Sequence, residues 1–177
     1  MKPYAIVVSG LPGSGKTSLA EALAAELGLP WVSKDRVKEV LADSLGLSVE
    51  RSHDLGRAAV QVLLSFARAA PQVIVESFFW PGLSEPELLA LDRPLVQIHC
   101  RCDPTLARAR FNDRANMGNR HHVHHDFDDW EQFSAGAGRL DLPGALIEIQ
   151  TAEPVDVDRV AAMVRAALRT ADQSPRP

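Results

Sequence analysis

Eight residues near the start of the chain have the types and the spacing that bind phosphate groups. Gly10 to Thr17 reads Gly-Leu-Pro-Gly-Ser-Gly-Lys-Thr, and the apolar run Ala5 to Val8 comes directly before it. Glycines at these positions let consecutive backbone N–H groups curl around an anion, Lys16 can reach the β and γ phosphates, and the Thr17 hydroxyl can bind Mg²⁺. The motif therefore predicts a site for a nucleoside triphosphate and Mg²⁺, formed by Gly10, Pro12, Gly13, Ser14, Gly15, Lys16, Thr17 and Ser18.

Phosphoryl transfer also requires a residue that activates the attacking oxygen and cations that neutralise charge. Asp35 follows the strand-like segment 31–33, so we expect it close to the phosphate loop, where it can act as a general base or hold a water on Mg²⁺. The alternative for Asp35 is a helix N-cap, a position that favours Asp. Arg110 and Arg114 are about one helical turn apart; we expect one to stack on the nucleotide base and the other to contact phosphate. The alternative for the two arginines is a basic surface on the helix.

Polar and aromatic residues follow the apolar run 73–75. Glu76 lies where a parallel strand would end beside the phosphate loop, so it is a candidate to hold Mg²⁺ through water or to bind the acceptor. Phe78 and Trp80 come soon after. Aromatic side chains at a strand end either pack in the core or wall a pocket, and we expect Phe78 to pack and Trp80 to line the acceptor pocket.

Alternating strand and helix patterns position these residues. The patterns predict strands at 4–9, 31–33, 73–75, 95–100 and 145–149, joined by helices, with Val37, Val40, Leu41 and Leu45 as the buried face of the second helix. This order predicts a three-layer α/β fold of the P-loop NTPase type, a five-stranded parallel sheet with helices on both faces. We expect one domain over residues 1–170, with a lid at about 115–129, and a disordered tail at 171–177.

The motif and the segment Val32 to Glu39 together resemble the small P-loop kinases that include chloramphenicol phosphotransferase and the kinase domain of polynucleotide kinase. The resemblance continues through 73–78, 99–104 and 120–124. It implies that Asp35 activates the hydroxyl that is phosphorylated and that Lys38 lies near the acceptor. The alternative for Lys38 is a position on a solvated helix face. It further implies that Arg120 of the lid covers the phosphates.

The expected lid of this chain differs from that of the families it resembles. Those families commonly have the run Arg-His-Pro-Gly-His, and this sequence has His122-Val123 in place of the Pro-Gly. Four of the six histidines lie in 121–125, followed by Asp126, Asp128 and Asp129. A structural zinc site needs ligands held in a fixed geometry, and this cluster lies in an expected lid without a nearby cysteine. We therefore expect contacts with phosphate or the acceptor from this segment, with His124 as the candidate, rather than a transition-metal site.

Composition narrows the class of protein. A net charge of −4 argues against an extended nucleic-acid footprint, and no apolar run is long enough for a membrane span, so we expect a cytoplasmic protein, monomeric or homodimeric. The favoured function is a kinase that moves the γ-phosphate of ATP or GTP to a hydroxyl of a small molecule, with antibiotics of the chloramphenicol or capuramycin type as the suggested acceptors. The alternatives are a kinase for nucleic-acid ends, nucleotides or metabolites, and a non-catalytic module switched by nucleotide.

Overall fold

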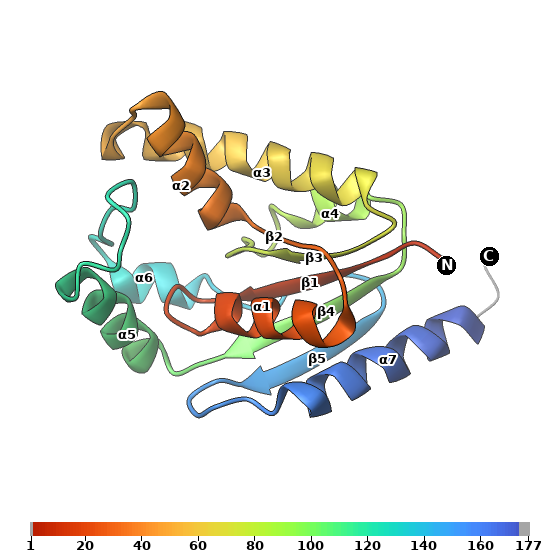
Figure 1. Cartoon of the computed structure of the whole chain (residues 1–177). Coiled ribbons are helices and arrows are strands. Elements are labelled where there is room, and N and C mark those ends of the chain that lie inside the picture. The colour runs from red at the N-terminus through yellow and green to blue at the C-terminus, as the bar shows by residue number, and fades with distance from the viewer. Residues whose placement is uncertain (1, 174–177) are drawn as a thin grey trace.

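A computed structural model describes residues 2–173 of the chain and contains one parallel sheet (Figure 1). The strands lie in the order β2-β3-β1-β4-β5. This confirms the predicted α/β fold with five parallel strands and helices on both faces. The elements are β1 (Tyr4–Gly10), α1 (Lys16–Leu27), β2 (Trp31–Ser33), α2 (Lys34–Leu45), a 3₁₀ turn (Val49–Arg51), α3 (Ser52–Ala69), β3 (Gln72–Glu76), α4 (Glu85–Leu89), β4 (Leu95–Arg101), α5 (Pro104–Asn116), α6 (Trp130–Ala135), β5 (Ala145–Gln150) and α7 (Val157–Gln173).

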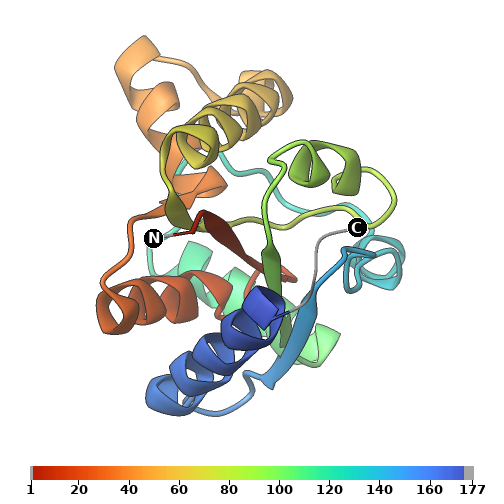
Figure 2. The ribbon, with the colours of Figure 1, turned by 90° about the vertical axis from the view of Figure 1, so that its right-hand side faces the viewer.

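Alternating strand residues divide the core into two layers. Ile6 and Val8 of β1 pack with α1 and α7 on one face, and Ala5 and Val7 pack with α3 and α4 on the other. Figure 2 shows helices on both faces of the sheet. Because β1 is covered on both faces, its side chains are buried along almost the whole strand. The strand ends that carry the phosphate loop are therefore held rigidly by the sheet.

Helix α2 differs from its predicted orientation. Val40 and Leu45, expected in the core, have 64% and 62% of their surface exposed, whereas Lys38 and Ala42 are buried. The physical reason is that α2 packs on α3, where the Lys38 ammonium finds a hydrogen-bond acceptor. Helical periodicity does not register a buried charge of this kind.

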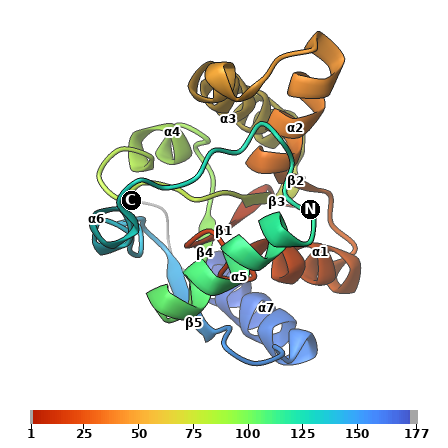
Figure 3. The same ribbon diagram turned by 90° about the vertical axis from the view of Figure 1, so that its left-hand side faces the viewer.

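The chain between α5 and α6, residues 117–129, is here called the lid segment. It runs from the end of α5 across to α2 and then to α6 (Figure 3). Val123 anchors it, fully buried beside Ala42 of α2 and Leu55 of α3. The segment begins slightly later than the predicted lid because α5 continues to Asn116.

Near the C-terminus, α7 continues to Gln173, past the predicted start of the disordered tail, and residues 174–177 lie outside the described residues. Cys100 and Cys102 are both free thiols. Within residues 2–173, no helix combines the length and the apolar content that a membrane crossing requires.

Candidate functional site

The predicted phosphate loop joins the end of β1 to the first turn of α1, and its backbone shape depends on glycine. Gly13 and Gly15 both have φ of +82°, and a Cβ on Gly13 would lie 2.0 Å from the carbonyl oxygen of Ala107 in α5. The Ser14 hydroxyl is buried and has no hydrogen-bond partner among the described residues. Such a loop directs backbone N–H groups into one concavity that suits an anion. The stretch contains all the residues predicted for it, Gly10, Pro12, Gly13, Ser14, Gly15, Lys16, Thr17 and Ser18.

A carboxylate from the neighbouring strand meets the loop. Val8 of β1 is in register with Glu76 of β3, so both strands end at the same edge of the sheet. The Lys16 ammonium lies 3.7 Å from Glu76 Oε1, and the Thr17 hydroxyl donates to Glu76 Oε2 at 3.3 Å. Lys16 and Glu76 are both almost fully buried. The structure thus brings a cation, a hydroxyl and a carboxylate together at the mouth of the loop.

Asp35 lies in the first turn of α2, and it is not the N-cap. Ser33 is the N-cap, since its hydroxyl accepts from the Arg36 N–H at 3.4 Å. The Asp35 carboxylate instead accepts from the Lys34 ammonium at 2.9 Å. The capping alternative for Asp35 is therefore wrong, and its carboxylate is directed to a cation.

The charges around Asp35 set its ionisation. Burial raises the pKa of Asp35, but the charges of Lys34, Lys16 and His124, together with the hydrogen bond from Lys34, hold that pKa well below its usual range. The carboxylate is therefore ionised at physiological pH. Lys16 of the phosphate loop is close enough to act on it, which links the loop with the first turn of α2.

Lys38 is buried one turn further along α2 and connects this helix to α3 and the lid segment. Its ammonium donates to the Ser52 hydroxyl at 2.5 Å, and that hydroxyl lies 3.1 Å from His125 Nδ1. Burial, and then the charge of Lys34, lower the pKa of Lys38, while Asp35 and Glu39 oppose the shift. The interpretation of Lys38 as a solvated surface residue is wrong. Neither Ser52 nor Glu39 was a candidate from the sequence, and only the spacing of Glu39, four residues after Asp35, hints at a shared helix face.

His124 of the lid segment faces the same helix. Its Nε2 lies 2.8 Å from Glu39 Oε1, and its charge is among those that lower the pKa of Asp35. Burial, then the charges of Lys38, His53 and His124, lower the pKa of His125. This shift favours the neutral ring of His125, whose Nδ1 can then accept the Ser52 O–H. Through these two histidines the lid segment contacts α2 and α3.

The two predicted arginines contact different parts of the protein, and their contacts with nucleotide stay predictions. Arg110 donates to the carbonyl oxygens of Thr151 and Ala152 at 2.8 and 2.6 Å, and so holds the loop that follows β5. Arg114 lies with its guanidinium carbon 5.8 Å from the centre of the Phe111 ring. A cleft of about 280 Å³ runs between this loop and the phosphate loop. Its lining is Gly15, Ser18, Leu19, Thr151, Glu153, Pro154, Val155 and Val157.

Arg120 of the lid segment forms an ion pair with Asp126 at 2.5 Å and lies over the Phe111 ring at 4.8 Å. It lines a cleft of about 500 Å³ beside α5, and within the described residues it forms no hydrogen bond to the phosphate loop. Coverage of the phosphates by Arg120 therefore stays a prediction.

The two aromatic residues after β3 pack against each other and against Phe133 of α6. Phe78 packs in the cluster around Leu11, as predicted, and it also lines a cleft of about 320 Å³ beside Gly10. Trp80 is 38% exposed and packs edge-on against Phe78 and Phe133, with ring centres 4.7 and 5.2 Å apart. The role of Trp80 in an acceptor pocket stays a prediction.

Comparison with known proteins places the fold. A family described as an AAA domain matches residues 6–132. The chain is 50% identical to a cytidylate kinase of Ignicoccus hospitalis over 44 residues, which cover 25% of this chain and 26% of that protein. The chain therefore spans about a quarter of the length of this curated relative.

Two solved structures resemble the whole chain. A candidate kinase from Chloroflexus aurantiacus is 32% identical with a TM-score of 0.87, covering 94% of this chain and 99% of that one. A gluconokinase from Sinorhizobium meliloti is 19% identical with a TM-score of 0.64, covering 98% of each chain, and this likeness shows the fold alone.

Proposed function

The chain belongs to this AAA-domain family, and we propose that it is a kinase that transfers the γ-phosphate of ATP or GTP to a hydroxyl group of a small molecule. The observation that carries the proposal is the ionised Asp35 carboxylate beside Lys34 and within electrostatic reach of Lys16. A module that only binds and releases nucleotide has no need of a carboxylate on the acceptor side of the phosphate loop.

The residues divide the work of transfer between them. The loop N–H groups and Lys16 hold the β and γ phosphates. Asp35 orients the acceptor hydroxyl and takes its proton as the bond from that oxygen to the γ-phosphorus forms and the bond to the leaving diphosphate breaks. Because the pKa of Asp35 is low, its main contribution is orientation of the hydroxyl and late proton acceptance.

The donor set at the loop fits Mg²⁺, which prefers oxygen ligands. Thr17 offers a hydroxyl and Glu76 a carboxylate at one point beside Lys16. Mg²⁺ bound there would neutralise charge on the phosphates. Arg110 fixes the loop after β5, and we assign the adjoining cleft to the nucleotide base.

For the acceptor, the resemblance to chloramphenicol phosphotransferase supports an antibiotic hydroxyl, with Lys38, Glu76 and His124 as contacts. A second candidate is an acceptor that carries a phosphate, such as the nucleotide that the name cytidylate kinase designates. The observation that favours it is the pair Lys34 and Lys38, one helical turn apart beside Asp35. Two cations there suit an anionic acceptor.

The test is ADP or GDP release with ATP or GTP and a panel of acceptors: chloramphenicol, capuramycin-type nucleosides, nucleoside monophosphates and gluconate. Lys16→Ala should lose nucleotide binding and transfer. Asp35→Asn should keep nucleotide binding and lose transfer by a factor of roughly 10²–10⁴. Asp54→Asn, which changes an exposed aspartate of α3, is the matched control. Transfer by Asp35→Asn at the native rate, or product release that no acceptor stimulates, would contradict the proposal.

A further inference from the structure

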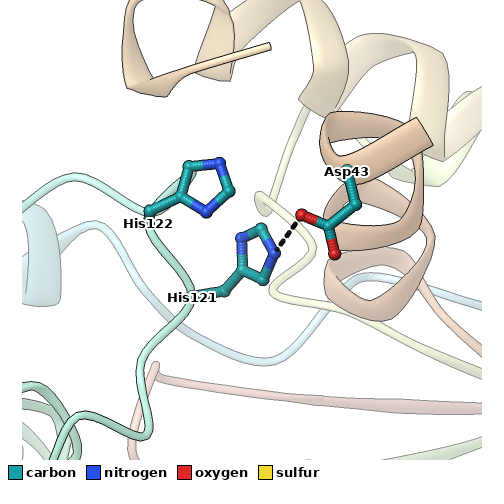
Figure 4. A group of neighbouring side chains, drawn as sticks. All are labelled: Asp43, His121 and His122. Atoms are coloured by element: carbon teal, nitrogen blue, oxygen red, sulfur yellow. Dashed lines mark hydrogen bonds and ion pairs between the residues drawn. The ribbon is translucent and has the colours of Figure 1, made fainter. Parts of the chain in front are cut away.

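A cluster of potential metal ligands lies between α2 and the lid segment, outside the residues used above. Asp43 of α2 and His121 and His122 of the lid segment each offer one ligand atom, and these atoms lie within 4.8 Å of one another (Figure 4). We propose that these three side chains bind a divalent transition-metal ion of the Zn²⁺ class. Two imidazoles and a carboxylate suit such an ion better than Mg²⁺, which takes oxygen ligands.

One ring nitrogen of His122 is held by the backbone, and the other is available to the cluster. Its Nε2 lies 3.3 Å from the carbonyl oxygen of Leu47, and since a carbonyl can only accept, Nε2 is the donor in this contact. In the neutral ring with its proton on Nε2, Nδ1 has the lone pair that a metal ion binds, and Figure 4 shows a ring nitrogen of His122 turned toward His121. Metal-binding histidines characteristically donate their other N–H to a carbonyl or carboxylate, which fixes the ring and the tautomer. The Leu47 carbonyl has that role for His122.

His121 and Asp43 are already placed at a ligand-to-ligand distance. His121 Nε2 lies 3.1 Å from Asp43 Oδ1, close to the ~3.3 Å that separates two ligands in a tetrahedral zinc site with bonds of about 2.0–2.1 Å. The Val123 N–H donates to His121 Nδ1 at 3.2 Å, so the ring proton is on Nε2 and Asp43 accepts it. The ion replaces that proton, which moves through solvent to Nδ1, and the rather long bond from Val123 is lost. No net proton is released.

Among the described residues, the ligand atoms that lie within 4.8 Å of one another come from these three side chains. The neighbouring His124 and His125 instead contact Glu39 and Ser52. Asp43 is 65% exposed on its side chain, which leaves room for water to complete the coordination. Ligands from α2 and from the lid segment share one ion, so metal binding ties the lid segment to the helix that carries Asp35.

The site is tested with the full chain, free of any histidine tag, by competition for Zn²⁺ against a chromophoric chelator at neutral pH. We expect one Zn²⁺ per chain, and binding weakened by roughly tenfold or more in His122→Ala and in Asp43→Asn. His53→Ala, which removes a histidine on α3 outside the cluster, should bind as the native chain does. Circular dichroism verifies that each variant is folded.

Co²⁺ provides a second measurement that does not depend on affinity. In the native chain, Co²⁺ should give the visible absorption of a low-coordinate nitrogen and oxygen site, and His121→Ala should abolish it. Failure of the native chain to bind Zn²⁺, or equal binding by the native chain and His122→Ala, would overturn the proposal. Because both measurements record binding alone, their outcome is separate from that of the proposed kinase activity.

Discussion

Replacing Gly13 with alanine tests whether the phosphate loop is held in shape by α5. The added Cβ would lie 2.0 Å from the Ala107 carbonyl oxygen and 3.2 Å from the Phe111 nitrogen. Ala107 is fully buried in a helix, so its backbone cannot move aside cheaply. Gly13 also has φ of +82°, a conformation that costs an L-residue about 1–2 kcal/mol.

The steric part of the effect can be isolated with Gly28→Ala. Gly28 ends α1 at φ of +65°, but a Cβ there would meet nothing within 4 Å. Gly28→Ala should therefore lose only the backbone contribution, about 1–2 kcal/mol of unfolding free energy. Gly13→Ala should lose a further ~1–3 kcal/mol from overpacking, which in a chain of this size is roughly 2–4 °C of Tm per kcal/mol.

The assay is urea and thermal unfolding of both variants without nucleotide, followed by nucleotide binding. Gly13→Ala should be the less stable variant and should bind nucleotide weakly, while Gly28→Ala should bind it normally. Equal losses of unfolding free energy in the two variants would show that α5 does not constrain the loop, and the reasoning would fail.

Two further predictions concern the contact between Lys38 and the lid segment. Ser52→Ala leaves the buried Lys38 ammonium without its acceptor, so we expect a loss of about 1–3 kcal/mol in unfolding free energy. The control Ser134→Ala, at a less buried position on α6, should change the unfolding free energy little. Urea unfolding measures both variants, and equal small losses would show that Lys38 does not depend on Ser52. The lowered pKa of His125 means that the unfolded chain takes up its proton at a higher pH than the folded chain, so stability should be complete above about pH 6.5 and fall as the pH decreases. His125→Asn should reduce this slope in urea midpoints between pH 7.5 and 5.5 without abolishing it, since burial also lowers the pKa of His99; an unchanged slope would mean that His125 contributes nothing.

The features that the sequence predicted are those encoded by neighbouring residues. The phosphate loop is contiguous, and the apolar strand before it fixes where its N–H groups point. Glu76 could be placed beside Lys16 and Thr17 because the carboxyl ends of parallel strands share one edge of the sheet. These inferences need only periodicity and the rules of parallel sheets.

The features that the sequence did not predict depend on contacts between distant segments. Lys38 is buried because Ser52, on another helix, accepts from it, and hydrophobic periodicity assigned that face of α2 to Val40 instead. Trp80 turns toward Phe133 of α6, and Arg110 binds carbonyl groups of a loop more than forty residues away. No local pattern distinguishes these partners from the other residues of the same types.

One row of α2 explains why the lid segment could not be interpreted from its own residues. Glu39 and Asp43 are spaced by four, so they share a helix face, and they contact His124 and His121 respectively. The carbonyl oxygen of Leu47, just beyond the end of α2, contacts His122. The same row begins with Asp35. In the sequence these carboxylates resemble an exposed charged helix face, and nothing near the histidines indicates which residues they contact. In the folded chain the carboxylates and the histidines are hydrogen-bond partners of each other. Because the charge of His124 also lowers the pKa of Asp35, the position of the lid segment is physically linked to the ionisation of the proposed base.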